Sequence, residues 1–397
     1  MKKKIGFLMV DSLPMPPVMG GAVENLVQLL IDNNEDNNKF EFHIYSLYDS
    51  KVESVNTGFK NTTYHYYKQK GISTIIAFVI RVIRYICRHH LNIYMPSLYE
   101  LQAKRLFKKL GIRTIVLENC PYSAIYMNKG NEFYLIQHLH NDYLYEHTKL
   151  IDQLLSRSQK FLAVSHFIKD RLLLITPQHI PVEICHNGLE LSKYDVVTTE
   201  DELDELKSKY GIERTDKVVT FIGRITRNKG VKELMLAFEK LLVKQKNMKL
   251  LIVGGQSFSK NTKDSYAKEL DEIATRLSSK VVFTGYVDYS EIYKYHQLST
   301  MIAVPSTCYE SFSLSTLESL ASGVPVLISD AGGMLEVIDD KCGLIAHRGD
   351  NFIEEISNAI ETICFNGLLY SEMCKAAKKR SQIFTDKSMY NSFIRSL

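Results

Sequence analysis

The chain has 397 residues, of which 45% are hydrophobic and 24% charged, so it is long enough for two domains and has the composition of a soluble globular protein. Its formal net charge of +4 is too small to indicate a nucleic-acid-binding protein. The seven cysteines include no C-x-x-C pair, which argues against a zinc site or a disulfide framework and fits a reducing compartment.

The chain starts with a basic stretch followed by a short apolar run, Ile5–Val10. A signal peptide begins in this way, but Asp11 ends the run and no small-residue cleavage site follows. We therefore expect Ile5–Val10 to be a buried parallel strand and the protein to be cytoplasmic. No window reaches the ~18 apolar residues of a membrane-spanning helix, so none is expected.

The loop after this strand ends in Gly20 and Gly21, just before a helix predicted for Glu24–Leu30. Glycine at such a position lets the backbone approach a ligand closely. The motif is not G-x-G-x-x-G, so the dinucleotide-binding fingerprint is absent. A plain tight turn would explain the two glycines equally well.

The segment 68–113 is strongly basic, with ten lysines and arginines against one acidic residue, Glu100. Within it, Ile72–Tyr94 is apolar with regular basic interruptions. Helices of this kind lie on anionic membrane surfaces, although a core helix whose arginines reach solvent would look the same. The basic residues are Lys68, Lys70, Arg81, Arg84, Arg88, Lys104, Arg105, Lys108, Lys109 and Arg113.

Further strands are expected at Phe40–Leu47, Thr114–Glu118 and Tyr134–Leu139. The last of these runs into His138 and His140. A histidine at the carboxyl end of a strand in an open α/β sheet faces the ligand crevice. A purely structural role is the alternative for either histidine.

A second series of strand, loop and helix units follows a charged stretch, Glu190–Asp216, which we interpret as a linker with a short helix. The strand Lys217–Ile222 leads into a loop that contains Arg224 and Lys229 and precedes a helix. Two such cations ahead of a helix form a clamp for a diphosphate. Solvated loop charges are the alternative.

The stretch from Val304 to Glu336 reads as strand, loop, helix, strand and loop. A helix that opens at Ser313 directs unpaired backbone N–H groups and a partial positive charge at the preceding loop, which suits a phosphate. Glu310 and Glu318 bracket this position, and carboxylates suit sugar hydroxyls. Two solvated glutamates on an ordinary βα unit are the alternative.

This stretch resembles the signature of the family 4 glycosyltransferases, in which seven residues separate two glutamates; here they are Glu310 and Glu318. F-S-L before the helix, A-S-G-V-P-V after it and G-G-x-x-E further on are similar to the family as well. So are the G-R…K-G pattern around Arg224 and Lys229 and the N-terminal G-G pair. The family's N-G-V-D appears as N-G-L-E, ending at Glu190, which puts one local contact in doubt.

The resemblance implies a GT-B fold: two facing Rossmann-like, doubly wound α/β domains with an interdomain cleft. It implies a nucleoside-diphosphate sugar donor, retention of anomeric configuration, and no cofactor or metal. Glu310 would orient the donor hexose, and Glu318 would hold the ribose. His140 would lie near the donor sugar, with His138 as the fallback. The catalytic set is thus Glu310, His140, Arg224 and Lys229, and the donor-binding set is Gly20, Gly21, Gly223, Tyr286, Ser311, Phe312, Ser313, Leu314 and Glu318.

Two domains are expected: an N-terminal acceptor-side domain at 1–188, completed by a crossing helix at about 382–397, and a nucleotide-sugar-binding domain at 189–381. The resemblance is absent from Ser50 to Ile112, where acceptor specificity is expected. The predicted reaction transfers a hexosyl group, with UDP as the favoured nucleotide, to a glycan or lipid-linked acceptor in cell-surface polysaccharide or glycoconjugate synthesis. The basic segment would bring the protein to the inner face of the cell membrane. Rival interpretations are a non-catalytic GT-B partner subunit and an epimerase or hydrolase of the nucleotide sugar.

Overall fold

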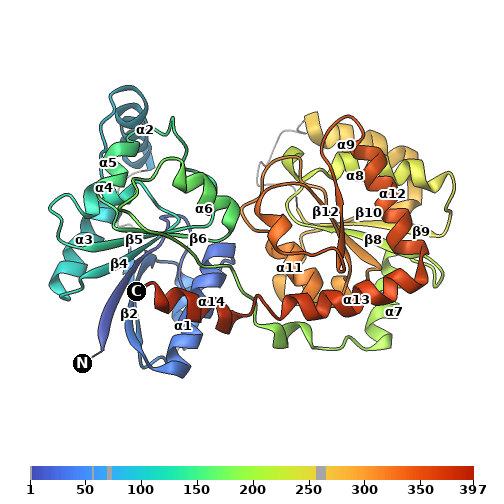
Figure 1. Ribbon diagram of the computed structural model, residues 1–397, viewed down its shortest axis with the longest axis horizontal. Helices are drawn as coiled ribbons and strands as arrows, with labels where there is room; N and C mark the ends of the chain where they lie inside the picture. The colour runs from blue at the N-terminus through green and yellow to red at the C-terminus, as the bar shows by residue number, and fades with distance from the viewer. Residues whose placement is uncertain (1, 56–57, 69–73, 256–264) are drawn as a thin grey trace. The chain divides into compact units, whose positions relative to one another are not determined.

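The computed structural model describes residues 2–55, 58–68, 74–255 and 265–397, apart from the side chains of 74–77 and 88–89. This part of the chain forms two compact units. Unit 1 comprises 1–188 and 386–397, and unit 2 comprises 189–385. Each unit is a parallel sheet with helices packed on it (Figure 1), so the predicted α/β class is confirmed.

Unit 1 contains a seven-stranded parallel sheet in the order β3-β2-β1-β4-β5-β6-β7. The central strands are buried apolar runs, as expected where helices cover both faces of a parallel sheet. The strand order reverses between β1 and β4, so ligands are expected beside the carboxyl ends of these two strands. The strands are β1 Lys3–Leu8, β2 Phe40–Leu47, β3 Thr62–Tyr67, β4 Thr114–Glu118, β5 Tyr134–Leu139, β6 Lys160–Ala163 and β7 Val182–Ile184.

The last helix of the chain, α14 (Asp386–Arg395), belongs to unit 1 and lies beside α1 (Ala22–Asn37; Figure 1). The Tyr390 hydroxyl donates to Asn34 Oδ1 at 3.1 Å, and the Phe393 ring stacks on Phe7 with centroids 5.7 Å apart. The remaining helices of unit 1 are α2 Thr74–His90, α3 Leu98–Lys109, α4 Ser123–Met127, α5 Ile151–Leu155 and α6 His166–Leu173, with the short 3₁₀ helix η1 Ser50–Ser54.

Unit 2 contains a six-stranded parallel sheet in the order β10-β9-β8-β11-β12-β13. Its order reverses between β8 and β11. The second switch point of the protein is therefore at the carboxyl ends of these strands. The strands are β8 Lys217–Ile222, β9 Met248–Val253, β10 Val281–Gly285, β11 Met301–Val304, β12 Val326–Ser329 and β13 Gly343–Ala346.

The helices of unit 2 pack their apolar faces on this sheet, as α8 does with Leu234, Met235 and Phe238. The α-helices are α7 Glu200–Tyr210, α8 Val231–Leu242, α9 Ser265–Leu277, α10 Ile292–Leu298, α11 Leu314–Ala321, α12 Phe352–Phe365 and α13 Gly367–Ser381. The 3₁₀ helices are η2 Leu191–Tyr194, η3 Arg227–Lys229, η4 Ser278–Lys280, η5 Tyr289–Glu291 and η6 Gly333–Glu336.

The sequence-based prediction missed the strands β3 and β13 and the helices α3, α4, α5, α6 and α9, and it made α1 too short. The strand β3 has the sequence T-T-Y-H-Y-Y at the edge of the sheet, so it lacks the apolar run of a central strand. The predicted apolar helix in the basic segment is present as α2, but residues 69–73 lie outside the described residues. No helix in the described ranges is both long and apolar enough to span a membrane.

Candidate functional site

The switch point of unit 2 brings together two loops that carry predicted donor-site residues. Gly223 and Arg224 follow β8, and the loop from Pro305 to Ser313 follows β11. Neighbouring parallel strands end at the same edge of a sheet, so the loops that follow them lie side by side. A hydrogen bond joins the two loops: the Thr307 N–H, after β11, donates to the Asn228 carbonyl, after β8, at 3.0 Å.

The contact between these loops requires a glycine at position 230. Gly230 has φ of 70°, which disfavours other residues, and a Cβ placed there would lie 1.8 Å from the Pro305 carbonyl oxygen. Glycine therefore lets the loop that carries Lys229 approach the backbone at the end of β11.

Lys229 and Glu310, which the sequence places in separate motifs, form an ion pair. Lys229 Nζ donates to Glu310 Oε1 at 2.5 Å, and the side chains are 23% and 16% exposed. Ser306 Oγ donates to the same carboxylate oxygen at 2.6 Å. The predicted phosphate-binding cation and the predicted hexose-binding carboxylate thus meet in one partly buried cluster.

The backbone of Glu310 is fixed by the loop after β12. The Glu310 N–H donates to the Ala331 carbonyl at 3.2 Å, and the Gly333 N–H donates to the Glu310 carbonyl at 2.8 Å. Gly332, between these partners, forms a parallel bridge with Glu310. The G-G-x-x-E motif therefore has a visible structural role, which is to hold Glu310 at the site.

The helix α11 begins at the predicted residue, with Ser313 as its N-cap. Ser313 Oγ accepts a hydrogen bond from the Thr316 N–H, while the N–H groups of Leu314 and Ser315 lie in the first turn, where no helical acceptor exists. Ser313 has φ of 90°, which is rare for a residue other than glycine. Backbone strain of this kind concentrates at ligand sites, and the helix dipole favours an anion here.

Glu318 lies one turn into α11 and is only 6% exposed. The Tyr289 hydroxyl donates to Glu318 Oε1 at 2.9 Å, and the Tyr194 hydroxyl lies 3.2 Å from that of Tyr289. Burial raises the pKa of Glu318 to about 7, although the tyrosine hydroxyls oppose the shift. The carboxylate therefore titrates near neutral pH and is surrounded by hydroxyl groups.

The other predicted donor-site residues differ in their exposure to solvent. The side chains of Arg224 and Tyr286 are exposed, the latter to 80%. Phe312 is 2% exposed and packs edge-on against Phe384 with ring centroids 5.5 Å apart, so its ring serves the packing of unit 2. Ser311 is half-buried in the same loop.

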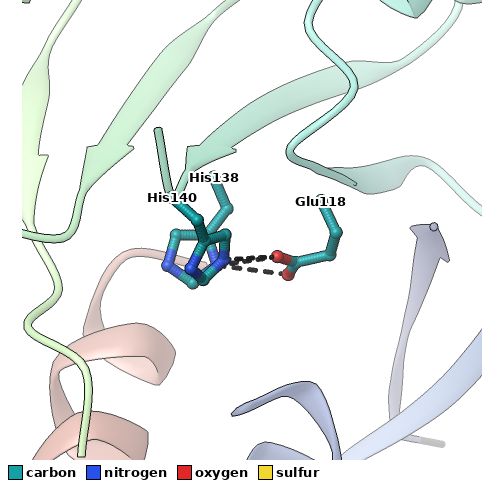
Figure 2. A group of neighbouring side chains, drawn as sticks. All are labelled: Glu118, His138 and His140. Atoms are coloured by element: carbon teal, nitrogen blue, oxygen red, sulfur yellow. Dashed lines mark hydrogen bonds and ion pairs between the residues drawn. The ribbon is translucent and has the colours of Figure 1, made fainter. Parts of the chain in front are cut away.

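In unit 1, both candidate histidines contact a glutamate that the prediction missed (Figure 2). Glu118 ends β4, and its register partner on β5 is His138. His138 Nδ1 lies 3.1 Å from Glu118 Oε2, and His140 Nε2 lies 3.0 Å from the same oxygen. The three side chains are almost fully buried.

Charge compensation determines the protonation of this cluster. Burial alone would raise the pKa of Glu118, but the His138 charge and hydrogen bonds from both histidines lower it to about 2. Burial would lower the pKa of His138, but Glu118 raises it to about 10. Burial and the His138 charge lower the pKa of His140. The group is thus a carboxylate, a protonated His138 and a neutral His140. Two imidazoles and a carboxylate could also hold a divalent cation, but these hydrogen bonds already account for their spacing.

The Gly20–Gly21 pair precedes α1 in the loop after β1, and both residues have positive φ, 72° and 109°. A Cβ on Gly21 would lie 2.1 Å from Glu24 Oε2 and 2.7 Å from Leu13. The two glycines therefore form a tight turn, and a side chain at Gly21 would not fit in it.

A hollow of about 410 Å³ opens at the switch point of unit 1. Its walls come from the ends of β1 and β4, from α2 and from the start of α3. Charged residues Asp11, Arg84 and Glu100 line it together with several tyrosines. Burial raises the pKa of Asp11, and the Arg84 charge opposes that shift.

The site residues that the prediction missed are Glu118, Ser306, Tyr194 and Tyr289. A sequence signal existed for Glu118, because it ends an apolar strand at the same sheet edge as His138. Ser306 and Tyr289 lie in loops, and no motif marks them.

These features together define a class of protein. Two doubly wound α/β units, one with a cationic loop, a helix N-terminus and two carboxylates at its switch point, describe a glycosyltransferase with a GT-B fold. Residues 203–380, which make up most of unit 2, match the family model of glycosyl transferases group 1. The predicted similarity to glycosyltransferases of this group and the predicted enzyme class are confirmed.

Three similar proteins illustrate the relationship. Bacillus subtilis YtcC, which is named as a glycosyltransferase, is 23% identical over 393 residues, which cover 96% of this chain and 88% of YtcC. An uncharacterized glycosyltransferase of Methanocaldococcus jannaschii is 30% identical over 183 residues, which cover 46% of this chain and only 45% of that protein. The crystal structure of Anabaena HepE in complex with UDP and glucose has a TM-score of 0.76 at 17% identity and covers 99% of both chains, which shows a shared fold.

Proposed function

We propose that the protein transfers a hexosyl group from UDP-hexose to an acceptor hydroxyl with retention of anomeric configuration. The observation that carries this proposal is the switch point of unit 2. There, the Lys229–Glu310 pair, the N-terminus of α11 and Glu318 occur in one site. These groups suit the diphosphate, the hexose and the ribose of a nucleotide sugar. UDP is favoured because HepE, which shares the fold, binds it.

The reaction breaks the bond between the anomeric carbon and the diphosphate and forms one to the acceptor oxygen. The acceptor proton passes to the leaving phosphate. Negative charge develops on the diphosphate, and the nearby cations and the N–H groups of Ser313 and Leu314 stabilise it. This electrostatic stabilisation would take the place of a divalent metal. Arg224 is well suited to binding the diphosphate, because its side chain is exposed and forms no ion pair with another described residue.

Glu310 would accept hydrogen bonds from the hexose hydroxyls. Its carboxylate is oriented by Lys229 and Ser306, and its backbone by Ala331 and Gly333, so its position is set before the donor arrives. Preorganised polar groups of this kind cost no rearrangement during the reaction. His140 in unit 1, held neutral and oriented by Glu118, is the proposed further contact to the donor sugar.

The acceptor would bind in the hollow at the switch point of unit 1. Carboxylates such as Asp11 suit sugar hydroxyls, tyrosine rings suit sugar faces, and Arg84 suits a phosphate group. These groups fit a glycan acceptor or a lipid-linked acceptor of cell-surface polysaccharide or glycoconjugate synthesis.

The helix α2 supplies a wall of this hollow and a wide exposed apolar surface. Phe78 is 64% exposed, and Val79, Val82, Ile83 and Ile86 are each 39–46% exposed. Exposed apolar clusters of this size mark an interaction surface. Arginines occur in the same helix, so its chemistry fits an anionic bilayer. We therefore propose that α2 binds the inner face of the cell membrane and presents the hollow to lipid-linked acceptors.

A thermal-shift panel tests the donor proposal. UDP, GDP, ADP and dTDP, with their hexose forms, are added to the protein, and binding to the native state must raise the melting temperature. A shift with the uridine compounds alone is expected. No shift with any nucleotide would contradict the proposal and favour a non-catalytic partner subunit.

Turnover experiments distinguish transfer from the rival reactions. With UDP-hexose alone, the expected result is slow or no consumption. Rapid release of free sugar or of an epimer would show a hydrolase or an epimerase instead. An Arg214→Gln variant, at a site 91% exposed on unit 2 outside the proposed machinery, should behave like the wild type.

Vesicle co-sedimentation tests the membrane proposal. Phe78→Ser with Val82→Ser should abolish binding to vesicles that contain anionic lipid, and wild-type binding should weaken as salt increases. Leu174→Ser is the matched control, because Leu174 is 86% exposed at the end of α6 in the same unit. Equal binding by all three proteins, or no preference for anionic lipid, would contradict the proposal.

A further inference from the structure

Two tyrosine hydroxyls lie beside the Glu318 carboxylate, which is proposed to bind the donor ribose. Tyr289 donates to Glu318 Oε1 at 2.9 Å, and the hydroxyls of Tyr289 and Tyr194 lie 3.2 Å apart. Glu318 thus already faces a pair of adjacent hydroxyl groups. A ribose presents the same chemistry through its 2′- and 3′-hydroxyls.

The two tyrosines differ in their freedom to move. Tyr194 is 8% exposed and packs in η2 with its ring 6.5 Å from that of His296. Tyr289 is 50% exposed and begins η5, a 3₁₀ helix of three residues in the loop after β10. A ligand that approaches Glu318 from solvent can displace the Tyr289 side chain, whereas Tyr194 is held by the surrounding core.

The buried carboxylate gives this exchange an energetic basis. A buried carboxylate that loses a hydrogen-bond donor must gain another one or pay the cost of an unsatisfied polar group. In the structure the Tyr289 hydroxyl satisfies Glu318 Oε1. A donor that takes this position must first release Tyr289, so its observed affinity is lowered by the strength of the Tyr289–Glu318 hydrogen bond.

We propose that Tyr289 competes with the donor ribose for Glu318 and holds this position until a nucleotide with a vicinal diol displaces it. The inference rests on the proposed function, because it assumes that Glu318 binds the ribose. Only a ligand that replaces the lost hydroxyl donor recovers the cost of displacing Tyr289. A 2′-deoxyribose offers one hydroxyl fewer and recovers less. Because the cost of releasing Tyr289 is the same for both ligands, a deoxyribonucleotide donor such as a dTDP-sugar is left with the lower net affinity.

Calorimetric titration with UDP and with 2′-deoxy-UDP tests this inference. The wild type should bind UDP about tenfold more tightly than 2′-deoxy-UDP. Tyr289→Phe removes the competing hydroxyl, so it should bind UDP about five- to tenfold more tightly than the wild type. Tyr293→Phe is the matched control, since it removes a half-buried hydroxyl from the neighbouring helix α10 and should leave both affinities unchanged.

A double-mutant cycle shows whether the effect passes through Glu318. In a Glu318→Gln background, Tyr289→Phe should change UDP affinity less than twofold. UDP affinity of Tyr289→Phe equal to or below that of the wild type would overturn the inference and leave the proposed function standing. So would equal wild-type affinity for the two nucleotides. A protein that binds no nucleotide at all would instead overturn the proposed function.

Discussion

Replacing Gly230 by alanine should destabilise unit 2 and disturb the donor site. A non-glycine residue in the left-handed region costs roughly 1–2 kcal/mol. The added Cβ would also lie 1.8 Å from the Pro305 carbonyl oxygen, which is backbone and cannot rotate away. Forced over-packing costs typically about 1–3 kcal/mol more. The expected loss is therefore about 2–5 kcal/mol in the free energy of unfolding.

Gly211 provides the matched control for this prediction. It has φ of 60° at the end of α7, and the nearest atom to a Cβ added there is the mobile Lys249 Nζ at 3.4 Å. Gly211→Ala should therefore cost only the conformational part, about 1–2 kcal/mol. In thermal unfolding, a domain of this size loses about 2–4 °C per kcal/mol. Gly230→Ala should thus melt roughly 2–12 °C below Gly211→Ala.

The function of the two variants should differ as well. The Pro305 carbonyl starts the loop that carries Ser306 and Glu310, so its displacement should weaken UDP binding in Gly230→Ala but not in Gly211→Ala. Equal melting temperatures for the two variants would refute the proposed close contact between the loops after β8 and β11.

Three further predictions concern the carboxylates. Glu310→Gln should lower kcat by about 10²–10³-fold while UDP affinity changes little, as measured by steady-state kinetics and calorimetry; unchanged kcat would contradict the assigned role. UDP affinity should rise between pH 6 and pH 8, because burial raises the pKa of Glu318 to about 7 and only its ionised form accepts two ribose hydroxyls; the profile should be flat in Glu318→Gln. The raised pKa of His138 adds stability that is complete below pH 6.5 and is lost as pH rises towards 10. Glu118→Gln should abolish this alkaline loss, because burial then lowers the pKa of His138 and leaves the ring neutral. The variant should still cost about 3–5 kcal/mol at neutral pH, since it removes one partner of a buried ion pair; melting temperatures of this variant that match the wild type across pH would count against the assignment.

Much of the donor site could be predicted because local sequence determines it. The apolar run that ends at Val304 and the helical spacing after Ser313 locate a strand, a loop and a helix, and this order places Glu310 and Glu318 on one βα unit. The loop with Lys229 follows another strand of the same sheet. Strand order then brings these residues together, and the resemblance to a known family supplied that order.

Contacts between distant parts of the chain could not be predicted in the same way. Glu118 meets His138 because β4 and β5 pair in one particular register, and a single sequence does not specify register. Tyr194, Tyr289 and Glu318 come from three separate elements, and no periodic pattern links them. The Lys229–Glu310 ion pair also depends on the approach that Gly230 permits.

The position of α14 determines the order in which the chain can complete its folding during synthesis. Unit 2 consists of one continuous stretch, 189–385, and every residue of it leaves the ribosome before α14 does. Unit 1 needs Tyr390 and Phe393 to cover Asn34 and Phe7. The half of the protein that is made first is therefore finished last. Deleting the final twelve residues should expose the core of unit 1 rather than that of unit 2, although those residues directly follow unit 2 in the chain.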